Sequence, residues 1–373
     1  MKKKISVLLA TVVIMMGLVA CGTKEEQTDS TEVAVAEGLR QEPYAQEEFL
    51  LGTYTRIRVY DEGKEDALQP AFDRIKELGD KITINQEGSE IDEINAQAGI
   101  APVKVSDDIY DLLKHAYAYS EESEGGYNMV IGAITQLWRI GFDDARKPSQ
   151  AEIDAALPLL DYKKVSFNDD EKTVYLEEKG MIIDLGAIAK GYIADEAAKV
   201  LKEHGVTSAI VDLGGNVLVV GHSWRGEGED WNIGVQDPNN ARGTILGSIK
   251  ESDKTVVTSG IYERFLEVDG VKYHHIFDTK TGYPYDNDIA SVSVITEKSI
   301  DGDGLTTVIF DKGIQEGLNY IEQETPEGTD AIFVTKEGDV YVTDGIKDTF
   351  KLDENSGYKM ADRSKLAQTE ESK

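Results

Sequence analysis

The sequence is short of three things: cysteine, basic residues and long apolar runs. Cys21 is the only cysteine among 373 residues, which excludes an internal disulfide. Lys and Arg total 39 against 70 Asp and Glu, and the formal charge is −31. This balance argues against a nucleic-acid partner, because phosphates need basic residues, and any phosphate ligand would need a metal ion to neutralise its site. Most of the acidity is typical of a solvated, soluble surface.

The longest apolar run lies at the N-terminus. Residues 5–20 follow the basic start MKKK and precede Cys21. The run is too short for a comfortable transmembrane helix, which needs about 20 apolar residues. It is typical of a secretory signal peptide, which we place at residues 1–20. The tetrapeptide LVAC resembles a bacterial lipobox and predicts lipidation of Cys21 and a membrane anchor; a plain signal peptide with a chance cysteine is the alternative.

Two polar segments flank the part of the chain that can fold. Residues 21–46 begin with the lipidated cysteine and are acidic and without apolar periodicity, so we expect a disordered tether. Residues 353–373 resemble them and are expected to form a polar tail. The remaining 47–352 are long enough for one large domain.

The pattern within this domain predicts an α+β fold. Short strands come in hairpins, of which the one turning at Asp269-Gly270 carries the strongest signal. Helical spacing appears in separate groups rather than alternating with single strands, which favours a largely antiparallel sheet over a doubly wound parallel one. Helices are expected at residues 65–81, 106–120, 149–160, 299–310 and 314–324, and hairpins at 173–184, 209–220, 231–249, 265–276 and 331–343.

A first candidate site lies in the stretch MIIDLGAIAK. An apolar strand would end at Asp184, and a helix would open after the small residues Gly186 and Ala187, leaving free N–H groups that attract anions. Lys190 in the first turns of that helix could reach a phosphate or a ring carbonyl. The alternative is structural, with Asp184 capping its own helix and Lys190 pointing to solvent.

A second candidate is the stretch SIDGDGLTTVIF. Asp303 and Thr307 are four residues apart and share one face of a helix, so they can offer a carboxylate and a hydroxyl oxygen to Mg²⁺. Asp301 lies almost a turn earlier and could assist. The alternative is a capping acid followed by a β-branched core residue.

Two weaker signals complete the set. Alternation places His274 and His275 on opposite faces of a strand, so only one can enter a given site; a structural histidine is the alternative. Gly126, Tyr127 and Asn128 combine exposed backbone with an aromatic edge, which suits a planar ligand.

The order and combination of these stretches resemble the ApbE family of FAD:protein FMN transferases, over about residues 51–352. Three departures stand out: Thr279 replaces the usual Pro, Tyr127-Asn128 stands where Phe-Asp is frequent, and Gly302 replaces Ala. The matching pieces are GTYTRIRVY, SEIDEIN, GGYNMVIGAITQLW, DLGAIAKGYIAD, DLGGNV, TSGIYERF, HIFDTKTG and DGLTT.

The resemblance implies a T-fold-like domain and a reaction. The family cleaves the pyrophosphate of FAD, passes FMN to a Thr or Ser hydroxyl of an acceptor protein as a phosphoester, and releases AMP. Asp303, Thr307 and the Ala187 carbonyl would bind Mg²⁺, while Asp184 and Lys190 would contact FAD. Further implied roles are a flavin pocket at Gly126, Tyr127 and Asn128, packing of His275 near the isoalloxazine, and a catalytic base at either Asp301 or Asp303.

The acceptor and the cellular location are also expectations. The resemblance implies acceptors with FMN-binding domains in extracytoplasmic electron transfer, and Cys21 implies a lipid anchor on the outer face of the cell membrane. Two alternatives stay open: an FAD pyrophosphatase that uses water as the acceptor, and a flavin-binding lipoprotein without chemistry.

Overall fold

The structure is a computed structural model that describes residues 34–366; the predicted signal peptide, Cys21 and the last residues of the predicted tail lie outside them. The helices are α1 Leu68–Ile82, α2 Glu90–Ala96, α3 Asp107–Glu122, α4 Gly132–Trp138, α5 Gln150–Ala156, α6 Ala189–Glu203 and α7 Ser299–Glu324. The strands are β1 Leu39–Leu50, β2 Thr53–Asp61, β3 Val103–Lys104, β4 Val165–Asn168, β5 Thr173–Leu176, β6 Ala209–Leu213, β7 Asn216–Val220, β8 Trp231–Gln236, β9 Ile245–Glu251, β10 Thr255–Gly260, β11 Phe265–Val268, β12 Val271–His274, β13 Ile289–Thr296, β14 Asp330–Thr335, β15 Asp339–Val342, β16 Lys351–Leu352 and β17 Lys359–Met360.

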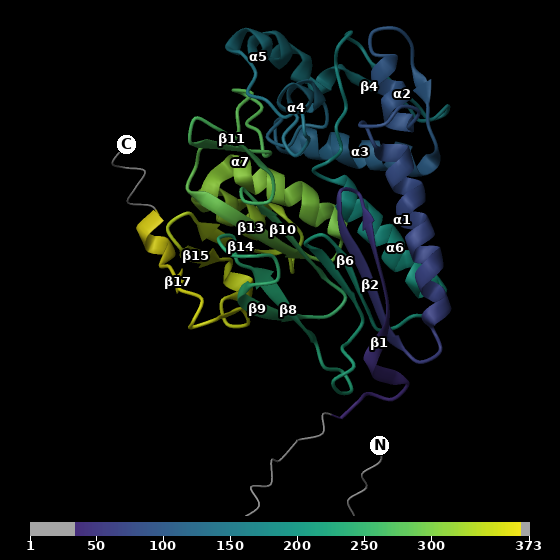
Figure 1. Ribbon diagram of the computed structural model, residues 1–373, viewed down its shortest axis with the longest axis vertical. Helices are drawn as coiled ribbons and strands as arrows, with labels where there is room; N and C mark the ends of the chain where they lie inside the picture. The colour runs from purple at the N-terminus through teal and green to yellow at the C-terminus, as the bar shows by residue number, and fades with distance from the viewer. Residues whose placement is uncertain (1–33, 367–373) are drawn as a thin grey trace, which may run out of the picture. The chain divides into compact units, whose positions relative to one another are not determined.

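A nine-stranded sheet forms the centre of the described region (Figure 1). Its order is β1-β2-β6-β7-β10-β13-β14-β15-β17, and all neighbours are antiparallel except β15 and β17. Three smaller sheets accompany it: β16-β9-β8, β3-β5-β4 and the hairpin β11-β12. The predicted α+β class with a largely antiparallel sheet is confirmed.

The inner strands of the large sheet are covered on both faces. In β14, Ala331 and Phe333 pack into the core that contains α7, whereas Ile332 and Val334 pack with the small sheet of β8 and β9. Every residue of β13 and β14 is buried as a result. Strands with two covered faces need near-continuous apolar runs instead of alternation, and this explains sequences such as AIFV.

Helices α1, α6 and α7 pack beside one another on one face of the sheet (Figure 1). Helices α6 and α7 approach each other closely at Gly191, where a Cβ atom would lie 2.1 Å from the Ser299 carbonyl oxygen, so only glycine fits. Each helix also caps the other. Asp195 of α6 accepts hydrogen bonds from the N–H groups of Ser299 (2.8 Å) and Ile300 (2.9 Å), and Asp303 of α7 accepts one from Gly191 (2.6 Å). We call these contacts the reciprocal caps.

Several local predictions are confirmed by the structure. Ser149 forms a capping box with Glu152 at the start of α5. The hairpin β11-β12 turns at Asp269-Gly270, both with positive φ. The two helices expected at 299–310 and 314–324 appear as α7, which is interrupted by the non-helical backbone of Gly313 (φ 75°, ψ −175°).

Three local predictions are wrong. Residues 39–46 were expected in the disordered tether but belong to β1. They pair with β2, and this pairing satisfies their backbone hydrogen-bonding groups although their composition is polar. The folded region also continues past residue 352, because β17 pairs with β15 and Tyr358 donates a hydrogen bond to Asp237 (2.6 Å). Residues 181–184 form no hairpin with β5; only Ile182 makes a bridge, to Ile131, while β5 pairs with β3 and β4.

Within residues 34–366, no helix has the length and apolarity needed to cross a bilayer.

Candidate active site

Asp303 is the centre of the candidate site. It lies in the second turn of α7 and its side chain is almost fully buried. One carboxylate oxygen accepts the Gly191 N–H at 2.6 Å, and the other accepts Asn216 Nδ2 at 2.9 Å and lies 3.4 Å from Lys190 Nζ. A buried carboxylate needs such partners, because burial of an unpaired charge is costly. Two of the predicted residues, Asp303 and Lys190, are therefore in contact.

Lys190 connects this buried cluster to an open cleft. Its ammonium also lies 3.3 Å from Asn216 Oδ1, and its side chain is 30% exposed. The cleft has a volume of about 400 Å³ and is lined by Lys190 together with Arg242, Arg264 and residues of the β1–β2 turn. The lysine thus brings a positive charge to a place that a ligand can reach.

Asp184 is held in a separate, neighbouring position. Its carboxylate accepts a hydrogen bond from Thr135 Oγ1 (2.6 Å) and one from the Gly186 N–H (2.9 Å), while its own N–H donates to the Met129 carbonyl (2.9 Å). The bond to Gly186 closes a local turn before α6, whose N-cap is Ile188, so Asp184 does not cap the helix as the structural alternative predicted. The side chain stays half-exposed, so one edge is open to a ligand.

The proposed metal donors were tested against the structure. Within the described residues, no group of three or more His, Cys, Asp or Glu side chains could hold a metal ion. The donors predicted here are of another kind: the Asp303 carboxylate, the Thr307 hydroxyl and the Ala187 carbonyl. Neither of the last two oxygens takes part in a hydrogen bond within residues 34–366. An all-oxygen set with one carboxylate suits Mg²⁺, which keeps several waters.

Asp301 lies on another side of α7. Its carboxylate accepts a hydrogen bond from Tyr119 Oη at 2.9 Å, and burial together with Asp301 raises the pKa of that phenol. Asp301 and Asp303 are two positions apart in α7, so their side chains leave the helix about 200° apart around its axis. The structure therefore joins Asp301 to α3 and does not bring it into the cluster around Asp303.

The segment 126–128 is mostly built into the core. Gly126 packs so closely on Asp311 that a Cβ atom would lie 2.6 Å from its carboxylate. Tyr127 is 1% exposed, and burial, with Asp184 and Asp303 nearby, raises the pKa of its phenol. The Asn128 side chain donates to the Leu160 carbonyl oxygen (2.7 Å) and accepts the N–H of Val130, two residues along the same segment (3.0 Å). The Tyr127 and Asn128 side chains therefore hold the segment in place instead of lining an open surface.

The two histidines occupy opposite faces, as alternation predicted. His274 is buried and bonded to the Tyr285 carbonyl (2.9 Å), and burial lowers its pKa to about 4. His275 is partly exposed, and its Nδ1 lies 3.2 Å from the Arg264 carbonyl oxygen. Burial and the charge of Arg264 lower the pKa of His275, so its ring is neutral at pH 7.

Sequence reasoning missed four residues that position this site. Asn216 and Gly191 bind the Asp303 carboxylate directly, Thr135 binds Asp184, and Asp195 caps α7. All four lie within the stretches quoted above: Gly191 and Asp195 in DLGAIAKGYIAD, Asn216 in DLGGNV and Thr135 in GGYNMVIGAITQLW. Which groups they bind becomes visible only when distant segments are brought together.

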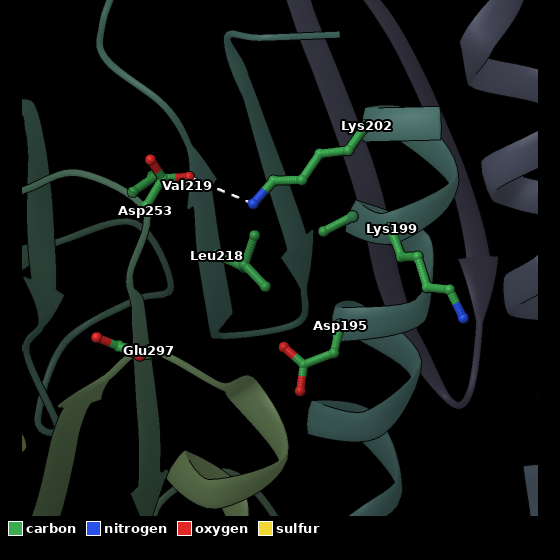
Figure 2. Close-up of a pocket in the computed structure, with 8 residues that line it drawn as sticks. Asp195, Lys199, Lys202, Leu218, Val219, Asp253 and Glu297 are labelled. Atoms are coloured by element: carbon green, nitrogen blue, oxygen red, sulfur yellow. Dashed lines mark hydrogen bonds and ion pairs between the residues drawn. The ribbon is translucent and has the colours of Figure 1, made fainter. Parts of the chain in front are cut away.

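Asp195 borders a second cavity, of about 150 Å³, that shares no lining residue with the Lys190 cleft. Figure 2 shows Lys202 reaching across it to Asp253, with which it makes an ion pair of 3.3 Å, while Lys199 points away. Burial raises the pKa of Asp195 to about 6, with smaller contributions from Asp301 and Asp303.

The fold and site together define a class of protein. Among solved structures, an ApbE protein from Thermotoga maritima is similar at a TM-score of 0.75 and 31% identity, covering 82% of this chain and 98% of that one. The flavinyl transferase ApbE from Pseudomonas stutzeri, in its apo form, is similar at 0.70 and 25%, covering 82% and 96%. The class is that of the flavin transferase fold.

Sequence comparison gives the family. The sequence model described as the ApbE family matches residues 51–333, and the chain belongs to that family. A relative from Klebsiella pneumoniae (strain 342), named FAD:protein FMN transferase, is 38% identical over 320 residues, covering 86% of this chain and 97% of the relative. A relative of the same name from Treponema pallidum (strain Nichols) is 37% identical over 328 residues, covering 84% and 90%.

Proposed function

We propose that this protein transfers the FMN half of FAD to a Thr or Ser hydroxyl of an acceptor protein and releases AMP. The relatives that match along most of the chain are named for this activity. The observation that carries the proposal is the cluster around Asp303, in which a buried carboxylate meets Lys190 at the wall of a cleft. A protein that only stored flavin would have no need of a buried carboxylate and a lysine there.

The reaction balances as a single displacement. The acceptor oxygen forms a bond to the phosphorus on the FMN side of the diphosphate, and the bond from that phosphorus to the bridging oxygen breaks. AMP leaves with the electron pair, and the hydroxyl proton passes to a base or to solvent. Catalysis of this kind depends mainly on positioning and on stabilising negative charge.

The residues of this chain divide the work. Lys190 would bind an oxygen of the diphosphate; its contacts with Asn216 and Asp303 and its position in the cleft lining support this role. We assign Asp184 and the neutral His275 to the flavin end on the family resemblance; an uncharged imidazole can pack on a ring without the large cost of burying a charge. When bound by Asp303, Thr307 and the Ala187 carbonyl, Mg²⁺ would supply a Lewis acid for the diphosphate.

The base that takes the acceptor proton is proposed to be Asp303. Asp303 contacts Lys190, which lines the cleft, whereas Asp301 is bonded to Tyr119 on a different side of α7. The local environment therefore supports Asp303 over Asp301.

We further propose that the enzyme is anchored through Cys21 on the outer face of the cell membrane. The apolar run and the LVAC stretch support this location, and the polar residues 22–38 would let the domain reach acceptors with FMN-binding domains on the same membrane.

Product analysis tests the proposal and separates its rival. The full-length protein is incubated with FAD and Mg²⁺, with and without a membrane-protein extract, and AMP, FMN and flavin-labelled threonines are measured by chromatography and mass spectrometry. Transfer predicts that AMP release depends on the extract and equals the flavin bound to protein. Equal release of free FMN and AMP without extract would identify a pyrophosphatase, and no AMP under either condition would contradict both.

A further inference from the structure

Tyr127 carries a buried hydroxyl that no other part of the fold binds. The residue is 1% exposed and lies in the hydrophobic core, and its hydroxyl has no hydrogen-bond partner within residues 34–366. A buried hydroxyl without a partner is costly, because it has lost its bonds to water. A phenylalanine would fill the same space without this cost, so packing alone does not account for the tyrosine. The hydroxyl therefore indicates a partner that binds to the folded protein from outside.

The Tyr127 ring is held against one face of α7. Three residues spaced three and four apart share this face: Gly304, Thr307 and Asp311. The Tyr119 ring covers one end of the face, where a Cβ atom on Gly304 would lie 3.0 Å from it. Gly126 packs on the other end, where its Cβ atom would lie 2.6 Å from the Asp311 carboxylate. Tyr127 follows Gly126 in the chain, and its ring packs edge to face on Tyr119 with centroids 6.0 Å apart. The ring is therefore held between the two ends, at the level of Thr307.

Asp184 borders the segment that carries Tyr127 on another side. The Asp184 N–H donates to the carbonyl oxygen of Met129, two residues after Tyr127 (2.9 Å). Burial, and then the charges of Asp184 and Asp303, raise the pKa of the Tyr127 phenol. The phenol therefore keeps its proton and lies near both carboxylates of the candidate site.

The hydroxyl of the neighbouring Tyr119 is satisfied, in contrast to that of Tyr127. It donates to the Asp301 carboxylate at 2.9 Å, and after burial Asp301 is the largest cause that raises the pKa of Tyr119. The Tyr127 phenol responds instead to Asp184 and Asp303. Two tyrosines in contact thus lie near different carboxylates, and of these two hydroxyls only that of Tyr127 lacks a partner in the fold.

The Tyr127 hydroxyl resembles the proposed cation donors in this respect. The Thr307 hydroxyl and the Ala187 carbonyl also take part in no hydrogen bond within residues 34–366. Mg²⁺ binds few protein oxygens and keeps several waters, whose protons need acceptors. A neutral phenol oxygen is such an acceptor.

We propose that the Tyr127 hydroxyl is a further binding group of the cation site and accepts a hydrogen bond from a water molecule that the divalent ion carries. Residues that hold the ligands of a metal ion in place typically change its affinity by about 10- to 100-fold when they are removed. Tyr127 is thus a positioning residue, which fixes a water of the ion and makes no contact with FAD. This inference rests on the cation site of the proposed function and adds a residue that sets its affinity.

The flavin ring and a lone buried water are the competing partners. A flavin ring needs an open face to pack on, and the Tyr127 side chain offers none. A lone water would bind the hydroxyl whether or not a cation is present. A water of the cation also explains why the hydroxyl lies near Asp303 and at the level of Thr307.

The test compares Tyr127→Phe with Tyr119→Phe, which removes the satisfied hydroxyl from the neighbouring ring. Each full-length protein in detergent is titrated with Mg²⁺ alone by isothermal titration calorimetry. We expect Tyr127→Phe to raise the Kd for Mg²⁺ about tenfold and Tyr119→Phe to leave it unchanged. Without Mg²⁺ the order is reversed. Thermal denaturation should then show a lower Tm for Tyr119→Phe and no loss for Tyr127→Phe, because only Tyr119 loses a hydrogen bond of the fold.

A second measurement uses AMP release with FAD and the membrane-protein extract, and it decides the matter where Mg²⁺ binds only together with FAD. The Mg²⁺ concentration for half-maximal release should rise about tenfold in Tyr127→Phe. The rate at saturating Mg²⁺ should stay within about twofold of that of the parent protein, since the change affects binding and not the chemical step. A merely structural role would lower the rate at every Mg²⁺ concentration.

Unchanged dependence on Mg²⁺ in Tyr127→Phe, in both measurements, would overturn the inference and assign the hydroxyl to a lone water. An equal loss of Tm in the two variants without Mg²⁺ would also overturn it, because the Tyr127 hydroxyl would then have a partner in the fold. AMP release by the parent protein that does not depend on Mg²⁺ would contradict the cation site and the inference with it. Absence of AMP release under all conditions would contradict the transfer reaction, and the calorimetric titrations would still test Tyr127.

Discussion

Two sides of the first turns of α7 carry the same chemistry and have different surroundings. The side facing α6 presents Asp303, whose carboxylate is shared among a backbone N–H, an amide and a lysine beside the cleft. The side facing α3 presents Asp301, whose carboxylate accepts a hydrogen bond from the Tyr119 hydroxyl. Two carboxylates only two residues apart thus differ completely in what they can contribute. The comparison shows that the partner helix, and not the residue type, assigns the role.

The largest expected effect is on the α6 side. Asp303→Asn should lower the rate of FAD-dependent AMP release by about a thousandfold or more, because the amide cannot serve as an anionic ligand or as a base. Asp301→Asn should lower it by less than about tenfold. The rate of AMP release is measured by chromatography for both variants, with circular dichroism to confirm that they fold. Equal losses of rate would contradict the difference between Asp303 and Asp301.

Gly191, at the contact between α6 and α7, and Gly304, at the contact between α7 and α3, should also differ in their tolerance of a side chain. A methyl group at Gly191 would meet the backbone oxygen of Ser299 at 2.1 Å, whereas one at Gly304 would meet the ring of Tyr119 at 3.0 Å, and a side chain can move. Gly191→Ala should cost about 3 kcal/mol of unfolding free energy and Gly304→Ala about 1 kcal/mol. Urea denaturation of both variants measures this, and a milder Gly191 variant would show that α6 and α7 separate easily.

A pH effect is expected on the cap that α6 gives to α7. Burial raises the pKa of Asp195 to about 6, above its ordinary value of 3.8, so the folded state binds more protons than the unfolded state between these values. Stability contributed by protonated Asp195 is therefore present at low pH and lost as pH rises from about 4 to about 6, on the order of 3 kcal/mol. The unfolding free energy of Asp195→Asn should lack this decline. Identical pH slopes for the variant and the parent protein would contradict the raised pKa.

The smallest effect is expected on the α3 side. Tyr119→Phe removes the hydrogen bond to Asp301 and should cost about 1 kcal/mol of stability without changing the rate of AMP release. Thermal denaturation and the same AMP assay check both parts. A large loss of activity would bring Asp301 and Tyr119 into the reaction and remove the contrast on which the other predictions depend.

Much of the fold could be predicted from the sequence because the signals are local. The capping box at Ser149, the hairpin at Asp269-Gly270 and the break at Gly313 each depend on a few adjacent residues. The prediction of a strand at 181–184 was wrong because its signal is also local. The same apolar sequence can pair as a strand or be buried as an irregular segment, and its actual partner, Ile131, lies far away in the sequence.

The candidate site shows a similar division. Asp303 and Lys190 could be named from their own stretches, and the structure places them in contact. The contacts that Asp303 makes with Lys190, Gly191 and Asn216 depend on how α6 and β7 pack against α7, which no spacing within one helix encodes. The side chains of Tyr127 and Asn128 were expected at a pocket wall for their chemistry, and only packing shows that they are buried.

Because of the reciprocal caps, the Asp303 carboxylate proposed for the chemistry also stabilises the packing of α6 against α7. The Asp303 carboxylate already accepts the N–H of Gly191 in the first turn of α6, and Asp195 accepts two N–H groups from the first turn of α7. Each helix N-terminus is therefore capped only when the other helix is in place. No fragment ending before α7 can contain an assembled site, and a chain folded only as far as α6 has none. A substitution that separates α6 from α7 should therefore remove the helix caps and the carboxylate site together.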